Sequence, residues 1–269
     1  MNTDLNQIKI LSVELLDLQR TIVEEMRRLS EELNLGLGWH YLLDLSWAVQ
    51  QLNLTHGMWV IDAGAGIGIM QWWLVEQGVD VISVDRQDRK NLPVRFRQRY
   101  RIQGLREEDF VKKPALYNFL PSLSPRRWHR YLQKLGRSIK HLYNRLKIAS
   151  GSGTVFIYNQ DLKSMMDIPD ESMDVVVSIS ALEHNEPDDL RDIVGELMRV
   201  LKPSGKLIAT LGAAKDRDWF HEPSRGWCYT EMTLRDIFNL STDCLSNYYK
   251  YDKLFNALKN CRELSDNLA

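Results

Sequence analysis

Residues 60–68 read Val-Ile-Asp-Ala-Gly-Ala-Gly-Ile-Gly, and this stretch decides the fold. Its first half is a short apolar run of the kind that forms a buried strand. Its second half is a glycine-rich turn that opens a helix. Glycines there let the backbone bend tightly and approach a ligand that a Cβ atom would obstruct. The stretch therefore predicts a strand, a ligand-binding turn and a helix in succession.

Short apolar runs alternate with helical sequence over the rest of the chain. The runs cover residues 58–62, 79–85, 154–159, 173–178 and 205–211. A helical pattern over 189–201 precedes the last run and is followed by a Lys-Pro-Ser-Gly turn. This alternation predicts a doubly wound, mostly parallel, Rossmann-like α/β sheet. Such sheets bind their ligands outside the carboxyl ends of the strands.

Two helical patterns precede the first strand. Residues 5–33 carry apolar side chains at helical spacing, in a heptad-like register that slips at Met26. A second, aromatic-rich pattern runs from Trp39 to about Leu52. We therefore expect an N-terminal helical region over 1–56 and an α/β domain over 57–269. The long helix either packs on its own domain or forms a homodimer contact.

The interval between the second and third strands is longer than a crossover helix needs, and it is strongly basic. Residues 86–147 contain 18 Lys or Arg and four acidic residues, a net charge of +14 in a chain whose total is −1. We expect a basic helical insertion over about 87–152. Within it, residues 126–147 alternate apolar and basic side chains at helical spacing, which predicts a basic amphipathic helix.

Three uses of this amphipathic helix stay open. It can be a lid whose apolar stripe packs on the domain. It can lie on an anionic membrane surface or bind a lipid-linked substrate. It can also follow nucleic-acid phosphates. Nucleic acid is the least favoured of the three, because no aromatic-flanked RNA motif accompanies the basic residues.

The side chains around the glycine turn narrow the choice of cofactor. Asp62 stands two positions before Gly64, and the spacing through Gly66 is GxGxG instead of the dinucleotide GxGxxG. A carboxylate there repels a pyrophosphate but can accept hydrogen bonds near an ammonium group, directly or through water. No Gly-Lys-Ser/Thr phosphate anchor follows. The turn therefore favours a ligand with an ammonium group and no phosphate.

Acidic residues at two further strand ends complete the expected cofactor site. Asp85 ends the second strand, where a carboxylate can accept hydrogen bonds from both hydroxyls of a ribose, and Arg86 follows it. Asp161 follows the third strand and can accept from an adenine amino group, with Leu162 packing on the ring. An adenosine group joined to an ammonium predicts S-adenosylmethionine, with S-adenosylhomocysteine as its product.

At this point the sequence resembles the class I S-adenosylmethionine-dependent methyltransferases, particularly the small-molecule branch that includes the ubiquinone-biosynthesis enzymes. The resemblance covers roughly residues 58–85 and 155–212. The motifs that carry it are VIDAGAGIG, VISVD, Asp161, PDESMDVVVSISALEH and LMRVLKPSGKLIAT. It implies that the carbonyl of Ser178 contacts the methionine portion of the cofactor.

The sequence departs from this family in two ways. The basic insertion is not part of the common core. The family sheet usually ends with antiparallel sixth and seventh strands, yet only residues 244–251 have a strand-like pattern here, before a helical tail over 253–268.

Two histidines are candidates for the chemistry. Transfer to an alcohol needs a base, because the nucleophile arrives protonated. His184 follows the fourth strand, and His221 follows the fifth, so both are expected at the ligand-binding edge. Their structural alternatives are a helix-capping role and loop packing, and Tyr229 is a third, weaker candidate. The acidic residues around His184 fit the first turn of a helix better than a metal site, so no metal is predicted.

Composition places the chain among ordinary globular proteins, with 44% hydrophobic and 26% charged residues. No secretory signal or membrane-spanning run is present, and the three cysteines are scattered. We expect a cytoplasmic protein, with peripheral membrane contact open. The predicted function is methyl transfer to a small-molecule or glycan-type acceptor, with oxygen as the favoured nucleophile. An RNA-directed methyltransferase and a cofactor-binding module without turnover are the alternatives.

Overall fold

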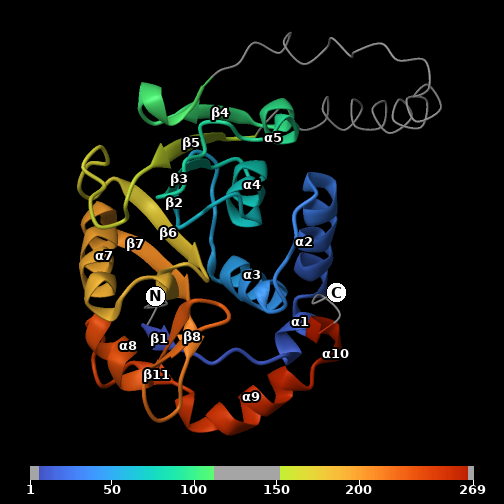
Figure 1. Ribbon diagram of the computed structural model, residues 1–269, viewed down its shortest axis with the longest axis vertical. Coiled ribbons are helices and arrows are strands. Elements are labelled where there is room, and N and C mark those ends of the chain that lie inside the picture. Colours follow the sequence, from blue (N-terminus) through green and yellow to red (C-terminus); the bar gives the residue numbers. More distant parts are fainter. Residues whose placement is uncertain (1–5, 112–151, 266–269) are drawn as a thin grey trace, which may run out of the picture.

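A computed structural model describes residues 6–111 and 152–265 and shows a central six-stranded sheet (Figure 1). The strand order is β4-β5-β3-β2-β6-β7, and every neighbouring pair is parallel. The strands are β2 (Trp59–Ala63), β3 (Asp80–Asp85), β4 (Arg101–Gly104), β5 (Thr154–Asn159), β6 (Met173–Ile179) and β7 (Leu201–Thr210). The predicted Rossmann-like α/β fold is therefore confirmed.

Helices cover both faces of this sheet. On one face lie α1 (Glu14–Leu18), α2 (Arg20–Leu33), α3 (Tyr41–Gln51), α4 (Ile69–Glu76) and α5 (Val94–Arg99). On the other lie α7 (Pro187–Val200) and α8 (Glu231–Ile237). Within β2, Val60 packs against the first group and Ile61 against the second, and both are fully buried. Burial on both faces explains why the central strands are continuous apolar runs.

The N-terminal helices share one core with the sheet. The expected helix over 5–33 is instead a short strand, β1 (Gln7–Ile8), followed by α1 and α2, which meet at Gln19. Val23, Met26, Leu29 and Leu33 of α2 are buried in the core that also contains the sheet. The sequence left this apolar stripe available for a homodimer contact, but its side chains are buried against the sheet of the same chain.

The basic segment begins differently from the prediction. Residues 94–104, expected in a helical insertion, form α5 and the edge strand β4, which pairs with β5. Ile102 is the one aliphatic residue of β4, so the apolar pattern did not reveal this strand. The predicted amphipathic helix over 126–147 lies outside the described residues.

Several arginines of this segment form internal contacts. Arg99 pairs with Glu32 and Glu76 at 2.7 and 2.9 Å, and Arg106 pairs with Asp109 at 2.9 Å. These contacts neutralise part of the local positive charge with acidic groups of the same chain.

The C-terminal part forms a small three-stranded sheet and several short helices. The small sheet has the order β8-β10-β9, with β8 (Gly212–Ala213), β9 (Trp219–His221) and β10 (Gly226–Tyr229). The strand expected over 244–251 is wrong, because only β11 (Leu245–Ser246) is extended and it pairs with β1. The side chain of Asn247 accepts a hydrogen bond from the backbone N–H of Ile10 and donates one to the backbone carbonyl of Ile10. These two bonds hold the segment against the N-terminal part of the chain.

Shorter elements complete the described chain. They are the 3₁₀ turns η1 (Glu107–Asp109), η4 (Leu182–His184) and η5 (Tyr248–Lys250), and the helices α9 (Tyr251–Lys259) and α10 (Arg262–Ser265). Helix α9 begins two residues before the helical tail expected over 253–268, and α10 lies within it. Among the described residues, no helix has both the length and the apolar character needed to cross a membrane.

Candidate functional site

The glycine turn between β2 and α4 has a backbone that requires glycine at two positions. Gly64 and Gly66 have φ angles of +74° and +48°, which residues with a Cβ atom rarely adopt. A Cβ on Gly64 would lie 2.4 Å from the Cβ of Ala181, which follows β6. The turn therefore packs directly against the end of a strand more than 100 residues away in the sequence.

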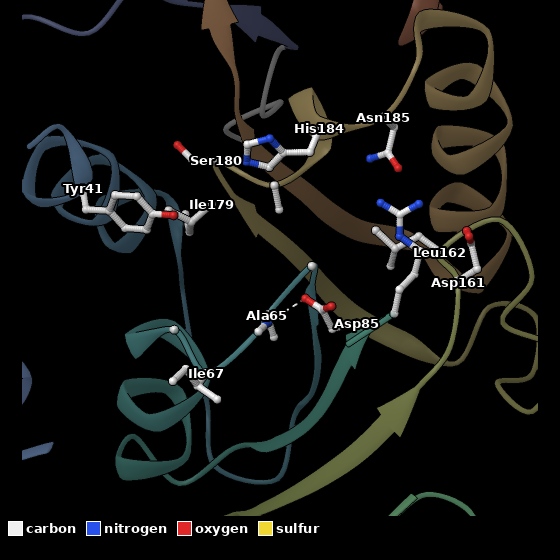
Figure 2. A pocket seen from close by; sticks show the side chains of 15 residues that line it. Tyr41, Ala65, Ile67, Asp85, Asp161, Leu162, Ile179, Ser180, His184 and Asn185 are labelled. Atoms are coloured by element: carbon white, nitrogen blue, oxygen red, sulfur yellow. Dashed lines mark hydrogen bonds between the residues drawn. The ribbon is translucent and has the colours of Figure 1, made fainter. Parts of the chain in front are cut away.

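A cavity of about 380 Å³ opens above this turn, at the carboxyl ends of the central strands (Figure 2). Such an edge is where doubly wound sheets bind their ligands. The residues that line it are Tyr41, Gly64, Ala65, Gly66, Ile67, Gly68, Asp85, Arg86, Asp161, Leu162, Ile179, Ser180, Ala181, His184 and Asn185. Six of the eight residues predicted to bind the cofactor are among them, as is His184.

Asp85 joins the second strand to the glycine turn. Its Oδ2 accepts a hydrogen bond from the backbone N–H of Gly66 at 2.8 Å, drawn in Figure 2, and its Oδ1 accepts from Gln87 N–H at 2.8 Å. A carboxylate offers about four lone-pair directions, so Asp85 can still accept from a ligand in the cavity. Asp161 and Leu162 lie on the same side of the cavity (Figure 2).

Asp62 and Ser178, also predicted to bind the cofactor, do not line the cavity. Asp62 is buried beneath the turn, where it accepts from the backbone N–H of Gln71 at the start of α4. Burial raises the pKa of Asp62 to about 7, although nearby Arg89 acts in the opposite direction. The hydroxyl of Ser178 donates to the carbonyl of Ala63 at 2.8 Å, within the sheet. The residues that follow it, Ile179 and Ser180, reach the cavity instead.

A buried polar network supports the turn from below. The amide of Gln71 donates to the carbonyls of Ala65, Gly66 and Gly68, at 3.1 to 3.4 Å. Arg89 is 3% exposed and donates to Gly66 O at 3.2 Å. It also donates to the carbonyls of Ser83 and Tyr158, which joins the ends of β3 and β5. Sequence reasoning missed Arg89, because one buried arginine has no signature among many exposed ones.

The two candidate histidines have different surroundings. The Nδ1 atom of His184 lies 2.9 Å from the carbonyl oxygen of Arg225. A carbonyl can only accept, so Nδ1 carries the hydrogen of the neutral imidazole and Nε2 has a free lone pair. His221 bonds Ser224 Oγ at 2.7 Å and does not line the cavity. Tyr229, the weaker candidate, is fully buried.

The acidic residues near His184 serve the helix that follows. Glu186 is the N-cap of α7, Pro187 is its first residue, and Asp188 and Asp189 lie in its first turn. Asp189 also pairs with Lys163 at 2.5 Å. Carboxylates in this position stabilise the positive end of the helix dipole.

The N-terminal helix α3 contributes the wall of the cavity opposite Asp161 and Leu162. Tyr41, at the first position of α3, directs its ring and hydroxyl toward the cavity (Figure 2). Sequence reasoning missed Tyr41 and also Asn185, which follows η4. The aromatic character of residues 39–52 was visible, but nothing in it indicated that the helix reaches the ligand-binding edge.

A buried polar cluster lies behind Tyr41. His40 Nδ1 bonds Asp44 Oδ2 at 2.6 Å. Burial alone would lower the pKa of His40, but the bond to Asp44 and the charges of Asp44 and Glu183 raise it. Burial raises the pKa of Glu183 to about 7, and its Oε2 has no hydrogen-bond partner among the described residues. Proton-accepting groups therefore concentrate at this end of the cavity.

A family model described as a methyltransferase domain matches residues 130–209, which include β5 through β7. The match covers less than a third of the chain, and it marks that part as similar to a methyltransferase domain. The sheet around it is the Rossmann-like one expected. The smaller family branch that includes the ubiquinone-biosynthesis enzymes stays a prediction.

Solved structures similar to this chain are distant from it. The YcgJ protein from Bacillus subtilis is 18% identical over 73% of this chain and 66% of its own, with a TM-score of 0.43. The chain thus spans just under two thirds of that protein. The 1,6-didemethyltoxoflavin-N1-methyltransferase of Burkholderia thailandensis, solved with S-adenosylhomocysteine, is 15% identical over 84% of this chain and 75% of its own, at 0.41. No curated protein matches the chain.

Proposed function

We propose that this protein is an S-adenosylmethionine-dependent methyltransferase that methylates a hydroxyl oxygen of a small-molecule or glycan-type acceptor, with His184 as the general base. The observation that carries the proposal is the contact between His184 Nδ1 and the carbonyl of Arg225. In the neutral ring it places the free lone pair on Nε2, on a side chain that lines the cavity. A general base must present a free lone pair beside the reacting group, and this histidine has one.

The residues on the opposite side fit the adenosine group of the cofactor. Asp85 would accept from the ribose hydroxyls, and Asp161 from the adenine amino group, with Leu162 against the ring. Gly64 and Gly66 would leave room for the methionine portion, and Arg86 would border the adenosine group. When bound, S-adenosylmethionine supplies a methyl group on a positively charged sulfur. Asp62 is buried beneath the glycine turn. It would favour that positive charge from a distance, without contacting the cofactor.

The proton of the acceptor hydroxyl would pass first to His184 and then to solvent. As the acceptor oxygen gains the methyl group and the C–S bond of the donor breaks, the hydroxyl proton would pass to His184 Nε2, which gives an imidazolium. Its Nδ1–H would stay bonded to the carbonyl of Arg225, which keeps the ring in place. His184 is exposed, so the proton can then leave to solvent. Positioning by the cavity walls supplies the remaining acceleration.

The test compares two histidines. His184→Ala should lower turnover by about 10²–10⁴-fold while the affinity for S-adenosylhomocysteine stays nearly unchanged. His221→Ala is the matched control, because that side chain also bonds a neighbouring group but lies outside the cavity. Turnover is measured as S-adenosylhomocysteine release with separate panels of phenols, sugars, amines and a structured RNA. Full activity of His184→Ala on a hydroxyl acceptor would refute the base assignment.

The same panels decide the acceptor class. Turnover with amines or RNA alone would replace the hydroxyl acceptor by one of those classes. Binding of the cofactor without turnover in any panel would favour the cofactor-binding module instead.

A further inference from the structure

The turn that follows β6 forms one wall of the cofactor cavity. Ser180 and Ala181 both line the cavity, and the Cβ of Ala181 occupies the space that a Cβ on Gly64 would need. Ser180 has a φ of +47°, in the left-handed region that residues with a Cβ atom seldom adopt. A turn in this conformation needs surrounding contacts that hold it there. The width of the cavity depends on those contacts.

Hydrogen bonds to Thr210 and Asp44 hold Ser180 in place, and His40 Nδ1 lies a further 3.5 Å from its hydroxyl oxygen. Its backbone N–H donates to the hydroxyl of Thr210, at the end of β7, at 3.0 Å. Its own hydroxyl donates to Asp44 Oδ2 at 2.9 Å, and this bond is buried. Asp44 belongs to α3, 136 residues earlier in the chain, and its side chain is 12% exposed. The carboxylate oxygen that holds Ser180 also accepts from His40 at 2.6 Å.

From this geometry we propose that Asp44 is a positioning residue of the cofactor site, which sets the cofactor affinity by holding the Ser180–Ala181 turn in its binding conformation. The proposal rests on the assignment of the cavity to the cofactor. It also means that residues 1–56 are not an accessory to the α/β domain. Their third helix supplies both Tyr41, which lines the cavity, and the carboxylate that holds the Ser180–Ala181 turn against the glycine turn.

The physical reason is conformational selection. A ligand that binds only one conformation has its apparent affinity reduced by the fraction of molecules that adopt it. A serine released from Asp44 leaves the left-handed region readily, because its Cβ atom disfavours that region. The Ser180–Ala181 turn then moves relative to Gly64, and fewer molecules have a cavity of the right width. The hydrogen bond is charge-assisted and buried, which is the strong kind.

The experiment measures S-adenosylhomocysteine affinity by calorimetry and stability by thermal unfolding on the same samples. Asp44→Ala should weaken binding about tenfold or more, because binding then has to restore the turn conformation. Ser180→Ala should weaken it less, since only one hydrogen bond is lost. Asp44→Asn should recover most of the affinity, because its amide oxygen can still accept from Ser180.

Two variants separate positioning from general stability. Ser46 lies on the same helix, is fully buried, and donates to the carbonyl of Leu42 at 2.6 Å. Ser46→Ala thus removes a comparable hydrogen bond and should lower the unfolding temperature without changing affinity. Ser180→Gly removes the same hydroxyl as Ser180→Ala but also the Cβ that disfavours the left-handed region, so it should bind more tightly than Ser180→Ala.

Three outcomes would overturn the proposal. Wild-type affinity in both Asp44→Ala and Ser180→Ala, at a temperature where both are folded, would refute the positioning role of Asp44. The assignment of the cavity to the cofactor would still stand. If Asp44→Ala does not fold, Ser180→Ala and Ser180→Gly decide, and unchanged affinity in both would again refute it. Cofactor binding that is insensitive to Asp85→Ala would refute the cavity assignment, and the positioning role with it.

Discussion

The cavity has two walls of different origin. One is the glycine turn of residues 64–68, held by Asp85 and by the amide of Gln71, all within about 20 residues of one another in the chain. The other is the Ser180–Ala181 turn, held by Asp44 of α3 and by Thr210. The first wall is built from local contacts and the second from contacts between distant segments.

This difference explains which residues of the cavity could be recognised from the sequence. The local wall needs glycines at fixed positions, followed by acidic strand ends at predictable distances, so its sequence is a motif. The distant wall needs one carboxylate on a helix that happens to pack beside β6. An aspartate in a helix has many ordinary roles, and its spacing from Ser180 carries no information. The second wall therefore has no motif, although the cavity depends on both.

The largest expected effect breaks the contact between the walls. In Gly64→Ala, the new Cβ would lie 2.4 Å from that of Ala181, and the φ of +74° would be strained. We expect a loss of about 2–4 kcal/mol in the free energy of unfolding and little remaining cofactor binding. Chemical denaturation and calorimetry measure the two quantities.

A second change separates the clash from the strain. Ala181→Gly removes the opposing Cβ, so the double variant should regain part of the lost stability, with the strain at residue 64 left over. Gly195→Ala is a matched control, because a Cβ there meets nothing within 4 Å. Equal losses in the single and double variants would show that the two walls are not in contact.

An intermediate effect is expected within the local wall. Asp85→Ala removes the acceptor for Gly66 N–H and for the ribose hydroxyls, and should weaken S-adenosylmethionine binding by about 1–3 kcal/mol. Calorimetry with S-adenosylmethionine and with NAD checks this prediction. Binding of NAD in place of S-adenosylmethionine would contradict the prediction that the glycine turn binds a ligand without a phosphate.

The smallest expected effect concerns pH. The pKa of Asp62 rises from 3.8 to about 7 on burial, so between these values the folded protein holds a proton that the unfolded chain releases. The contribution of Asp62 to stability should therefore fall as pH rises from about 4 to 7 and then level off. Glu183 acts in the same direction, because burial also raises its pKa to about 7.

Asp62→Asn should flatten part of that slope while keeping an acceptor for the start of α4. Denaturant unfolding at a series of pH values measures it. An unchanged slope would mean that Asp62 is ionised in the folded protein, with Arg89 compensating its charge.

Several predicted elements lie close to their observed places, and the exceptions have physical causes. Residues 154–159 form β5 as predicted, because a strand buried on both faces is apolar throughout. β4 was missed because an edge strand can be polar, and Arg101 and Gln103 of β4 are exposed. The Ser178 carbonyl was expected at the cofactor, but the residues that line the cavity at this strand end are the next two, Ile179 and Ser180, while the Ser178 hydroxyl bonds Ala63 O.

The sequence alone determined the strand–helix alternation of the central core, the glycine turn and the acidic strand ends, because each depends on residues close together in the chain. Only the tertiary structure showed that Tyr41 and Asp44 belong to the site and that Arg89 lies beneath it. It also distinguished His184 from His221, through the carbonyl of Arg225 that orients the first ring. Those features depend on side chains that meet across more than 20 residues, and up to 136, where sequence spacing no longer constrains distance.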